Sequence, residues 1–261
     1  MKLSIITINY NNHDGLQKTI DSVITQTYKD FEWIVIDGGS TDGSKELIEK
    51  YSDHITYWVS EPDKGIYNAM NKGVKKANGE YLNFMNSGDC FYNNDVLNSV
   101  IPYLNGTDIC VGDIVNDHPE GQKLVTFPRN NDTKTILDQL IFKFFPHPSS
   151  FIRNNLLKKY GNYREDLQIA SDWYFFFHSI VIGNASIRTI PFPIVLFDCN
   201  GISNTHNNRI NERQTSLTTS PVLQQLYVFY RDNLELSEAF NSTKLGRFIM
   251  RLYFFIYRQL H

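Results

Sequence analysis

Short apolar runs alternate with amphipathic segments along the first part of the chain. Runs rich in β-branched and aromatic residues predict buried strands at residues 3–8, 31–37, 55–61 and 79–85. Apolar residues at helical spacing predict helices at 15–27 and 65–77, the second with Asn68 and Asn71 on its exposed face. A further helix is predicted to present Leu47 and Ile48, with Ser40, Thr41 or Asp42 as its cap. This alternation predicts an α/β fold, with a mostly parallel sheet and helices on both faces, because crossovers between parallel strands are right-handed.

The second part of the chain has a less regular pattern. Strands are predicted at 108–115 and 187–197, helices at 131–143 and 153–160, and a helical pattern runs from Ser220 to the end. A chain of 261 residues can form one large domain with a helical extension.

All four early strands end in polar sequence, namely NYNNHDG, DGGSTDGS, EPDKG and NSGD. Ligands of open α/β sheets bind beyond the carboxyl ends of the strands, so Asp37, Asp63 and Asp89 are expected to gather at one edge. Any single polar strand end is an ordinary turn, but three carboxylates at one edge favour a ligand site. Asp89 in particular could hold a divalent cation that also touches substrate phosphates, or it could cap a turn; its spacing leaves both interpretations open.

Several nucleotide-binding and hydrolytic classes lack their motifs here. The first strand is not followed by G-x-G-x-x-G, and neither a G-x-x-x-x-G-K-[ST] loop nor a G-x-S-x-G elbow occurs. These absences argue against a dinucleotide-dependent dehydrogenase, a P-loop protein and an α/β-hydrolase.

Composition narrows the partners and the compartment. The net charge of −3 gives no reason to expect a nucleic-acid partner. The three cysteines lie far apart without metal-ligand spacing, which favours a reducing compartment. The first apolar run is too short for a signal peptide, and no apolar stretch is long enough to span a membrane. A cytoplasmic protein is therefore expected.

Four segments carry a family resemblance: SIITINYNN, FEWIVIDGGSTDGS, EPDKGIYNAMNKGVKKANGEYLNFMNSGD and ASDW. Together they resemble the family 2 glycosyltransferases of the GT-A (Rossmann-like) fold, of the bacterial surface-polysaccharide type. The likeness covers residues 1–215 and is most specific at 61–89. It implies a GT-A domain with a nucleotide-sugar half at 1–100 and an acceptor half at 101–215, followed by a helical region at 216–261.

The resemblance also implies an activity. It is the inverting transfer of a hexosyl group from a nucleotide-diphosphate sugar, with a UDP-sugar favoured, to a hydroxyl of a glycan acceptor carried on a lipid. Mg²⁺ or Mn²⁺ is the implied cofactor. The implied donor site comprises Thr7, Asn9, Tyr10, Asp37, Asp63, Asn68, Asn71, Asn86 and Ser87.

The sequence departs from the implied family pattern at three places, the first being Gly38, which stands where the usual second acidic residue after Asp37 would be. Asn86 and Gly88 replace the acidic residues of the D-x-D motif, which leaves Asp89 as the metal ligand. Asp172 of ASDW matches the catalytic base, with Ser171 in place of the usual glutamate; without the resemblance Asp172 is an ordinary helix cap. His147 and Trp173 fall on the implied acceptor side, although a histidine between two prolines is often structural.

Two other functions compete with this one. A nucleotide-sugar binding protein without catalytic activity would explain the loss of acidic residues from the D-x-D motif. Asp172 argues against it, because binding alone needs no base. A nucleotidyltransferase would also use a sheet edge and a metal carboxylate, but it normally has a basic glycine-rich loop after the first strand.

The C-terminal segment 244–261 combines a basic stripe with an apolar stripe. Such a helix can lie on an anionic membrane surface, which would place the protein at the inner face of the cell membrane. It could instead pack on the domain or on a second subunit, forming a homo-oligomer.

Overall fold

The computed structural model describes residues 2–143, 145–199 and 209–232. The first half contains β1 (Leu3–Asn9), α1 (His13–Ile24), β2 (Phe31–Asp37), α2 (Ser44–Lys50), β3 (Tyr57–Ser60), α3 (Ile66–Lys76) and β4 (Tyr81–Phe84). The second half contains β5 (Cys90–Phe91), α4 (Val96–Val100), β6 (Ile109–His118), β7 (Gly121–Val125), α5 (Thr133–Phe142), β8 (Ser150–Arg153), α6 (Asn154–Tyr160), α7 (Ser171–Phe177), β9 (Ile187–Asp198), α9 (Arg209–Ser216) and α10 (Pro221–Asp232). Short helical turns lie at Ser52–His54, Ile101–Tyr103, His178–Ile182 and Leu217–Thr219.

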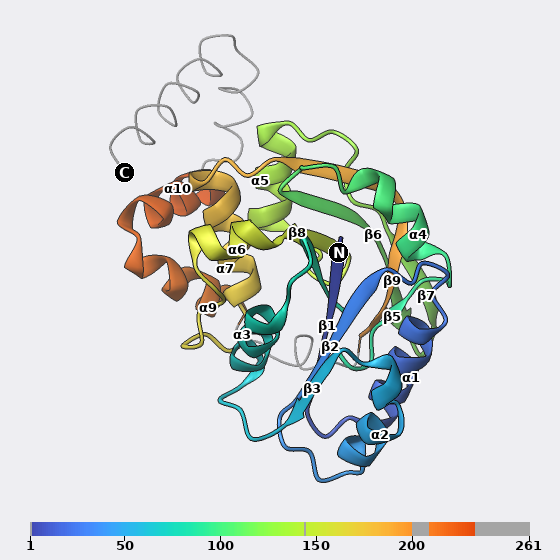
Figure 1. Ribbon diagram of the computed structural model, residues 1–261. Coiled ribbons are helices and arrows are strands. Elements are labelled where there is room, and N and C mark those ends of the chain that lie inside the picture. The colour runs from blue at the N-terminus through green and yellow to red at the C-terminus, as the bar shows by residue number, and fades with distance from the viewer. Residues whose placement is uncertain (1, 144, 200–208, 233–261) are drawn as a thin grey trace.

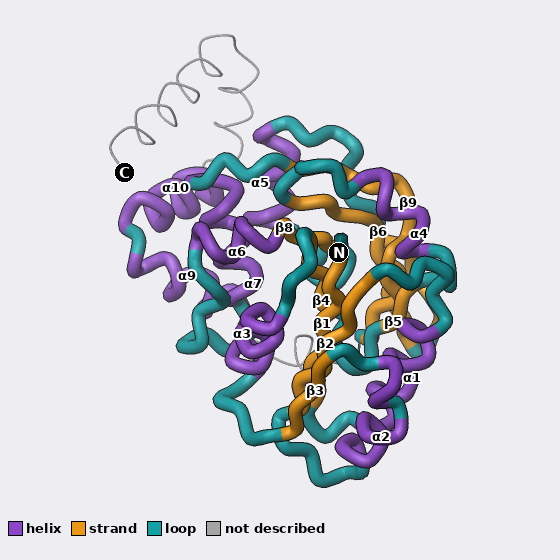
Figure 2. Tube along the Cα trace, in the orientation of Figure 1, coloured by secondary structure: helices purple, strands orange, loops and turns teal. Residues whose placement is uncertain are grey.

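The strands form one curled sheet in the order β3-β2-β1-β4-β8-β6-β9-β5, with β7 paired to β6 (Figure 1). The pairs β2–β3, β1–β2, β1–β4 and β6–β9 are parallel, and they contain most of the paired residues. One hydrophobic core lies between the sheet and α1, α2 and α4, and a second lies between the sheet and α3, α5, α6 and α7. Figure 2 shows helices on both sides of the strands, which confirms the predicted α/β class.

The order of the first strands locates a ligand site. The chain runs from β1 outward to β2 and β3, then returns to place β4 on the other side of β1. Crevices form at such a reversal, beyond the carboxyl ends of the strands. The segment after Asn9 and the NSGD turn at 86–89 therefore lie together at the reversal.

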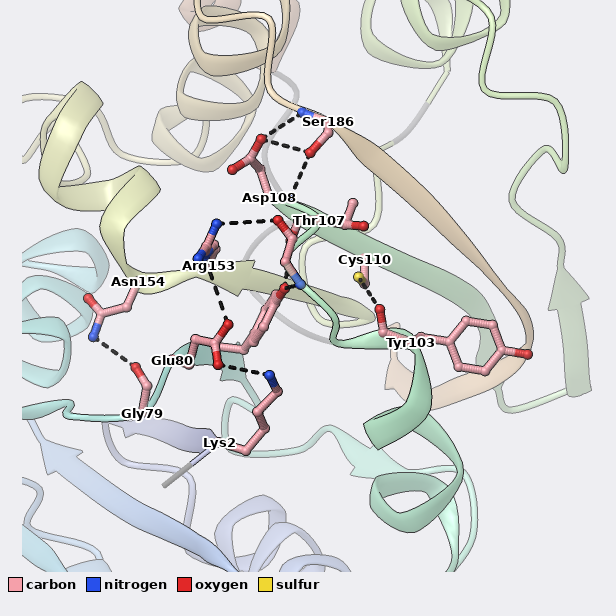
Figure 3. A network of polar contacts seen from close by, with 12 residues as sticks. Lys2, Gly79, Glu80, Tyr103, Thr107, Asp108, Cys110, Arg153, Asn154 and Ser186 are labelled. Atoms are coloured by element: carbon pink, nitrogen blue, oxygen red, sulfur yellow. Dashed lines mark hydrogen bonds and ion pairs between the residues drawn. The ribbon is translucent and has the colours of Figure 1, made fainter.

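Polar contacts join the strands at the end of the sheet that lies opposite the reversal. Lys2 Nζ lies 2.8 Å from Glu80 Oε2, and Arg153 lies 3.9 Å from the other oxygen of Glu80. The Asp108 carboxylate accepts hydrogen bonds from the backbone N–H and the hydroxyl of Ser186 (Figure 3). These contacts tie the starts of β1, β4, β6 and β9 together, away from the reversal.

Two local expectations were wrong. Helix α2 begins at Ser44, and its N-cap residue is Gly43, which has a φ of 93° and no side chain to cap the helix. Asp42 instead accepts hydrogen bonds from the backbone N–H groups of His13 and Ser44. Asn71 was expected on the solvated face of α3, but it is only 4% exposed.

The C-terminal helices were expected as a separate region. Tyr227 of α10 packs edge-on against Trp173, with ring centroids 5.9 Å apart, and Leu223 belongs to the same core. The domain boundary at 215 and the segment 244–261 stay predictions, and the latter lies outside the described residues. In the three described ranges, the structure contains no helix with the length and apolarity needed to span a membrane.

Candidate functional site

An exposed aromatic ring and a carboxylate flank a glycine at the ends of β1 and β2. The Tyr10 side chain follows β1 and is 63% exposed. A Cβ atom placed on Gly38 would lie 2.6 Å from Asp63 Oδ2 and 3.1 Å from Tyr10 Cδ2. Only glycine leaves room for these two side chains to approach at this point. The ring and the carboxylate together suit a flat, hydrogen-bonding ligand such as a nucleobase.

Asp37 lies beneath this surface and is fully buried. Its carboxylate accepts five hydrogen bonds, from the Asn9 amide, the Ser60 hydroxyl, the backbone N–H of Gly39, and both the backbone N–H and the hydroxyl of Ser40. Burial alone would raise the pKa of Asp37, but these hydrogen bonds outweigh it and lower the pKa. The residue therefore organises the loop after β2.

Two other predicted donor residues also face inward. Thr7 is buried and accepts a hydrogen bond of 3.0 Å from the Trp33 indole. Asn9 is 3% exposed, and its Oδ1 has no hydrogen-bond partner within the described ranges. Direct contacts of Thr7, Asn9 and Asp37 with a donor stay predictions.

The amides of Asn68 and Asn71 join α3 to the segment before α7. Both donate hydrogen bonds of 2.8 Å to the Glu165 carboxylate. Asn71 also exchanges hydrogen bonds with the backbone of Tyr163, at 2.8 and 3.0 Å. The donor contacts predicted for them stay untested, and the observed contacts fix the position of α3.

The NSGD turn is tied to the start of α1. Gly88 has a φ of 103°, which favours glycine, and its N–H donates to the Thr19 hydroxyl. The same hydroxyl donates to the backbone carbonyl of Asp89. Asn12 caps α1 and donates to the carbonyl of Ser87, at 3.1 Å. Asn86 contributes an Oδ1 that is buried without a hydrogen-bond partner among the described residues.

Asp198, at the end of β9, is a neighbour of Asp89 that sequence reasoning missed. Its backbone N–H donates to Asp89 Oδ1 at 3.0 Å, and its Oδ2 lies 2.9 Å from the position that a Cβ on Gly88 would take. Burial raises the pKa of Asp89 to about 8; the Asp198 carboxylate adds to the rise, and its N–H opposes it. Asp198 follows directly after the predicted strand 187–197, but only the pairing of β5 with β9 reveals its partner.

Asp198 and Gly88 of the NSGD turn line a cavity of about 230 Å³. Its lining includes Lys18, Gly88, Cys90, Asp117, His118 and Asp198. Within the described part of the chain, no three or more histidine, cysteine or acidic side chains form a metal-binding group. A cation held here would therefore need ligands from the substrate, as Mg²⁺ commonly does in phosphate chemistry.

Asp172 lies in the first turn of α7 and is half-buried. Its Oδ1 accepts a hydrogen bond of 3.0 Å from the Tyr67 hydroxyl of α3. Helix α3 thus connects the two parts of the site: Asp63 precedes it, and Tyr67 reaches Asp172.

His147 and Trp173 both lie in the aromatic core. His147 is 4% exposed and shares a hydrogen bond of 2.9 Å with the Tyr163 hydroxyl. Burial lowers the pKa of His147, and the nearby Asp172 carboxylate partly opposes this shift. The Trp173 indole donates to the carbonyl of Leu140 and stacks on Phe177. Their predicted acceptor contacts stay untested, and the observed contacts are structural.

Comparison with known proteins identifies the family of this chain. The family model described as glycosyl transferase family 2 matches residues 4–161. An uncharacterized glycosyltransferase of Mycobacterium tuberculosis, MT1564, is 34% identical over 77% of this chain and 76% of its own length. A PGL/p-HBAD biosynthesis glycosyltransferase of Mycobacterium bovis is 29% identical over 77% of this chain and 79% of its own.

Solved structures share the fold. S. aureus TarS 1-349, solved in complex with UDP, has a TM-score of 0.64 at 23% identity, over 76% of this chain and 60% of that one. Mannosyltransferase PcManGT from Pyrobaculum calidifontis, solved with GDP-Man and Mn²⁺, has a TM-score of 0.63 at 15% identity, over 99% of this chain and 86% of that one.

The curled, mostly parallel sheet and the solved structures that share it define a GT-A fold, and the family model and the relatives define the family. The chain belongs to glycosyl transferase family 2 and is a glycosyltransferase.

Proposed function

We propose that the protein is an inverting glycosyltransferase that uses a nucleotide-diphosphate sugar, with a UDP-sugar favoured, and a glycan hydroxyl as acceptor. The observation that carries this proposal is the hydrogen bonding of the two carboxylate oxygens of Asp172. One of its carboxylate oxygens is held by Tyr67, and within the described residues its Oδ2 accepts no hydrogen bond. A half-buried carboxylate with one oxygen fixed and the other open is suited to accept a proton.

The donor would lie across the reversal between β1 and β4. Tyr10 and Asp63 would contact the base and the ribose, and the NSGD turn would face the diphosphate. UDP is favoured because TarS 1-349, which shares this fold, was solved with UDP.

The carboxylates at the turn fit a divalent cation. Asp89 is buried, and its Oδ2 has no hydrogen-bond donor within the described ranges, while Asp198 brings a second carboxylate to the same point. Mg²⁺ or Mn²⁺ typically takes one or two protein carboxylates and completes its shell with phosphate oxygens and water. Asp89 and Asp198 would hold it, and it would neutralise charge on the departing diphosphate.

The transfer follows from these positions. Asp172 Oδ2 takes the proton of the acceptor hydroxyl as that oxygen attacks the anomeric carbon. The new bond forms on one face of the anomeric carbon while the bond from this carbon to the phosphate oxygen breaks on the opposite face. The carbon passes through an oxocarbenium-like state, and its configuration inverts. The nucleoside diphosphate leaves with the bonding electrons.

The acceptor is proposed to be a lipid-linked glycan of bacterial surface-polysaccharide synthesis. Support comes from the relative named for PGL/p-HBAD biosynthesis, which is 29% identical to this chain. A homo-oligomer and contact of segment 244–261 with a membrane stay predictions.

Turnover of donor by base variants tests the proposal. A panel of UDP-, GDP- and dTDP-sugars with Mn²⁺ should identify one donor whose nucleoside diphosphate is released, faster with an acceptor glycan. Asp172→Asn should bind this donor normally and lose activity by about 10³-fold. Asp166→Asn is a matched control. Asp166 lies only six residues before Asp172, and its exposed carboxylate pairs with Arg164. Wild-type turnover in Asp172→Asn would overturn the assignment of the base.

A further inference from the structure

Tyr67 has a buried hydroxyl, and among the described residues its polar contacts all belong to the first turn of α7. The side chain is 5% exposed, and its hydroxyl donates to Asp172 Oδ1 at 3.0 Å. The backbone N–H groups of Ser171 and Asp172 point toward the hydroxyl oxygen of Tyr67. Helix α7 begins after Ala170, which offers no capping side chain. A tyrosine distant in sequence therefore serves as the cap and holds the carboxylate at the same time.

The other titratable groups around Asp172 do not duplicate this contact. Tyr163 faces it from the segment before α7, and His147 faces it from the segment before β8, but these two groups share a hydrogen bond with each other. Burial raises the pKa of both tyrosines well above the ordinary value, so Tyr67 keeps its proton throughout the working range. Burial lowers the pKa of His147, which therefore stays neutral near pH 7.

Helix α3 holds Tyr67 at a fixed place. One turn further along the helix, Asn71 bonds the backbone of Tyr163, and both Asn68 and Asn71 bond Glu165. This segment leads directly into α7. The hydrogen bonds to Tyr163 and to Glu165 both join α3 to the segment before α7. Together they set the distance between Tyr67 and Asp172.

We propose that Tyr67 is a positioning residue for the transfer: its hydroxyl holds Oδ1 of Asp172 and leaves Oδ2 directed to the acceptor hydroxyl. This inference rests on the proposed function, in which Asp172 is the base. Tyr67 itself transfers no proton.

The test is the pH profile of turnover in Tyr67→Phe, which removes only the hydroxyl. We expect kcat to fall about tenfold, because the base loses its fixed orientation, while KM for the donor stays within about twofold. The acidic limb of the kcat profile should move to higher pH, because the reacting carboxylate loses a hydrogen bond. Tyr163→Phe is the matched control, because it also deletes one buried tyrosine hydroxyl, which bonds His147 rather than Asp172. The acidic limb of the kcat profile of this variant should not move.

A second substitution keeps the test decisive if Tyr67→Phe folds poorly. Tyr67→3-fluorotyrosine keeps the shape and makes the hydroxyl a stronger donor, so the acidic limb should move down. A profile that superimposes on the wild type in both variants would overturn the role of Tyr67, and so would equal shifts at positions 67 and 163. Asp172→Asn separates the two claims: full activity there removes the proposed function, whereas an inactive Asp172→Asn with an unmoved Tyr67→Phe profile removes this inference alone.

Discussion

Asp37 was predicted to contact the donor, and its carboxylate is hydrogen-bonded by other residues of the protein. Its oxygens accept five hydrogen bonds from the loop after β2 and from the neighbouring strands. This arrangement brings Gly38 beside Tyr10 and Asp63. The carboxylate therefore shapes the proposed nucleobase surface from below, whether or not it also contacts a donor.

Replacing Asp37 should make stability depend differently on pH. Asp37→Asn points an amide N–H₂ at groups that donate hydrogen bonds, so the free energy of unfolding should fall by about 1–3 kcal/mol near pH 7. Because the folded-state pKa lies below the ordinary value of 3.8, this contribution is present above that pH and is lost as the pH falls through the lowered folded-state pKa. Urea unfolding at pH 7 and near pH 3 measures the change. Asp14→Asn, at a side chain 99% exposed, is the control. An equal loss for Asp37→Asn at both pH values would contradict the account.

Among the elements, α3 connects the two parts of the site. It packs closely on β1, since a Cβ on Gly73 would lie 2.5 Å from the Ile6 Cγ2 methyl. The same helix presents Tyr67 to Asp172 and attaches to the segment before α7 through Asn71. Close packing on the sheet therefore sets the distance between the donor edge and the base.

Gly73→Ala tests that packing. The added methyl group must displace Ile6 in a dense core, which typically costs about 1–3 kcal/mol, partly offset by the higher helix propensity of alanine. We expect a net loss of about 1–2 kcal/mol in the free energy of unfolding, measured by denaturant titration, together with weaker turnover. Lys75→Ala, on the exposed side of α3, should change stability by less than about 0.5 kcal/mol. A Gly73→Ala protein as stable as the wild type would refute the tight approach.

The early elements were predictable from the sequence because each depends on its own residues. Apolar runs and helical spacing place β1 to β4 within about two residues of their observed ends. The cap of α2 was not predictable in this way, because the positive φ of Gly43 decides where the helix starts. The two-residue strand β5 is too short to produce a pattern, and Asp198 escaped notice because its contact with Asp89 spans 109 residues.

At the scale of the whole molecule, the return of β9 completes the site. Its pairing with β5 brings Asp198 to the NSGD turn, while contacts such as Lys2–Glu80 hold the far edge of the sheet (Figure 3). Two carboxylates from distant parts of the chain thus meet at the reversal between β1 and β4. This topology explains how a family 2 enzyme can lack the first acidic residues of its usual motif and still present two carboxylates.

The most direct test of the account is a calorimetric titration of UDP with and without Mn²⁺. We expect Mn²⁺ to tighten UDP binding by at least about tenfold, with the gain lost in Asp89→Asn and reduced in Asp198→Asn, while Asp14→Asn behaves like the wild type. If UDP fails to bind at any Mn²⁺ concentration, or if both site variants keep the full gain, the strand-end carboxylates do not form a nucleoside-diphosphate site.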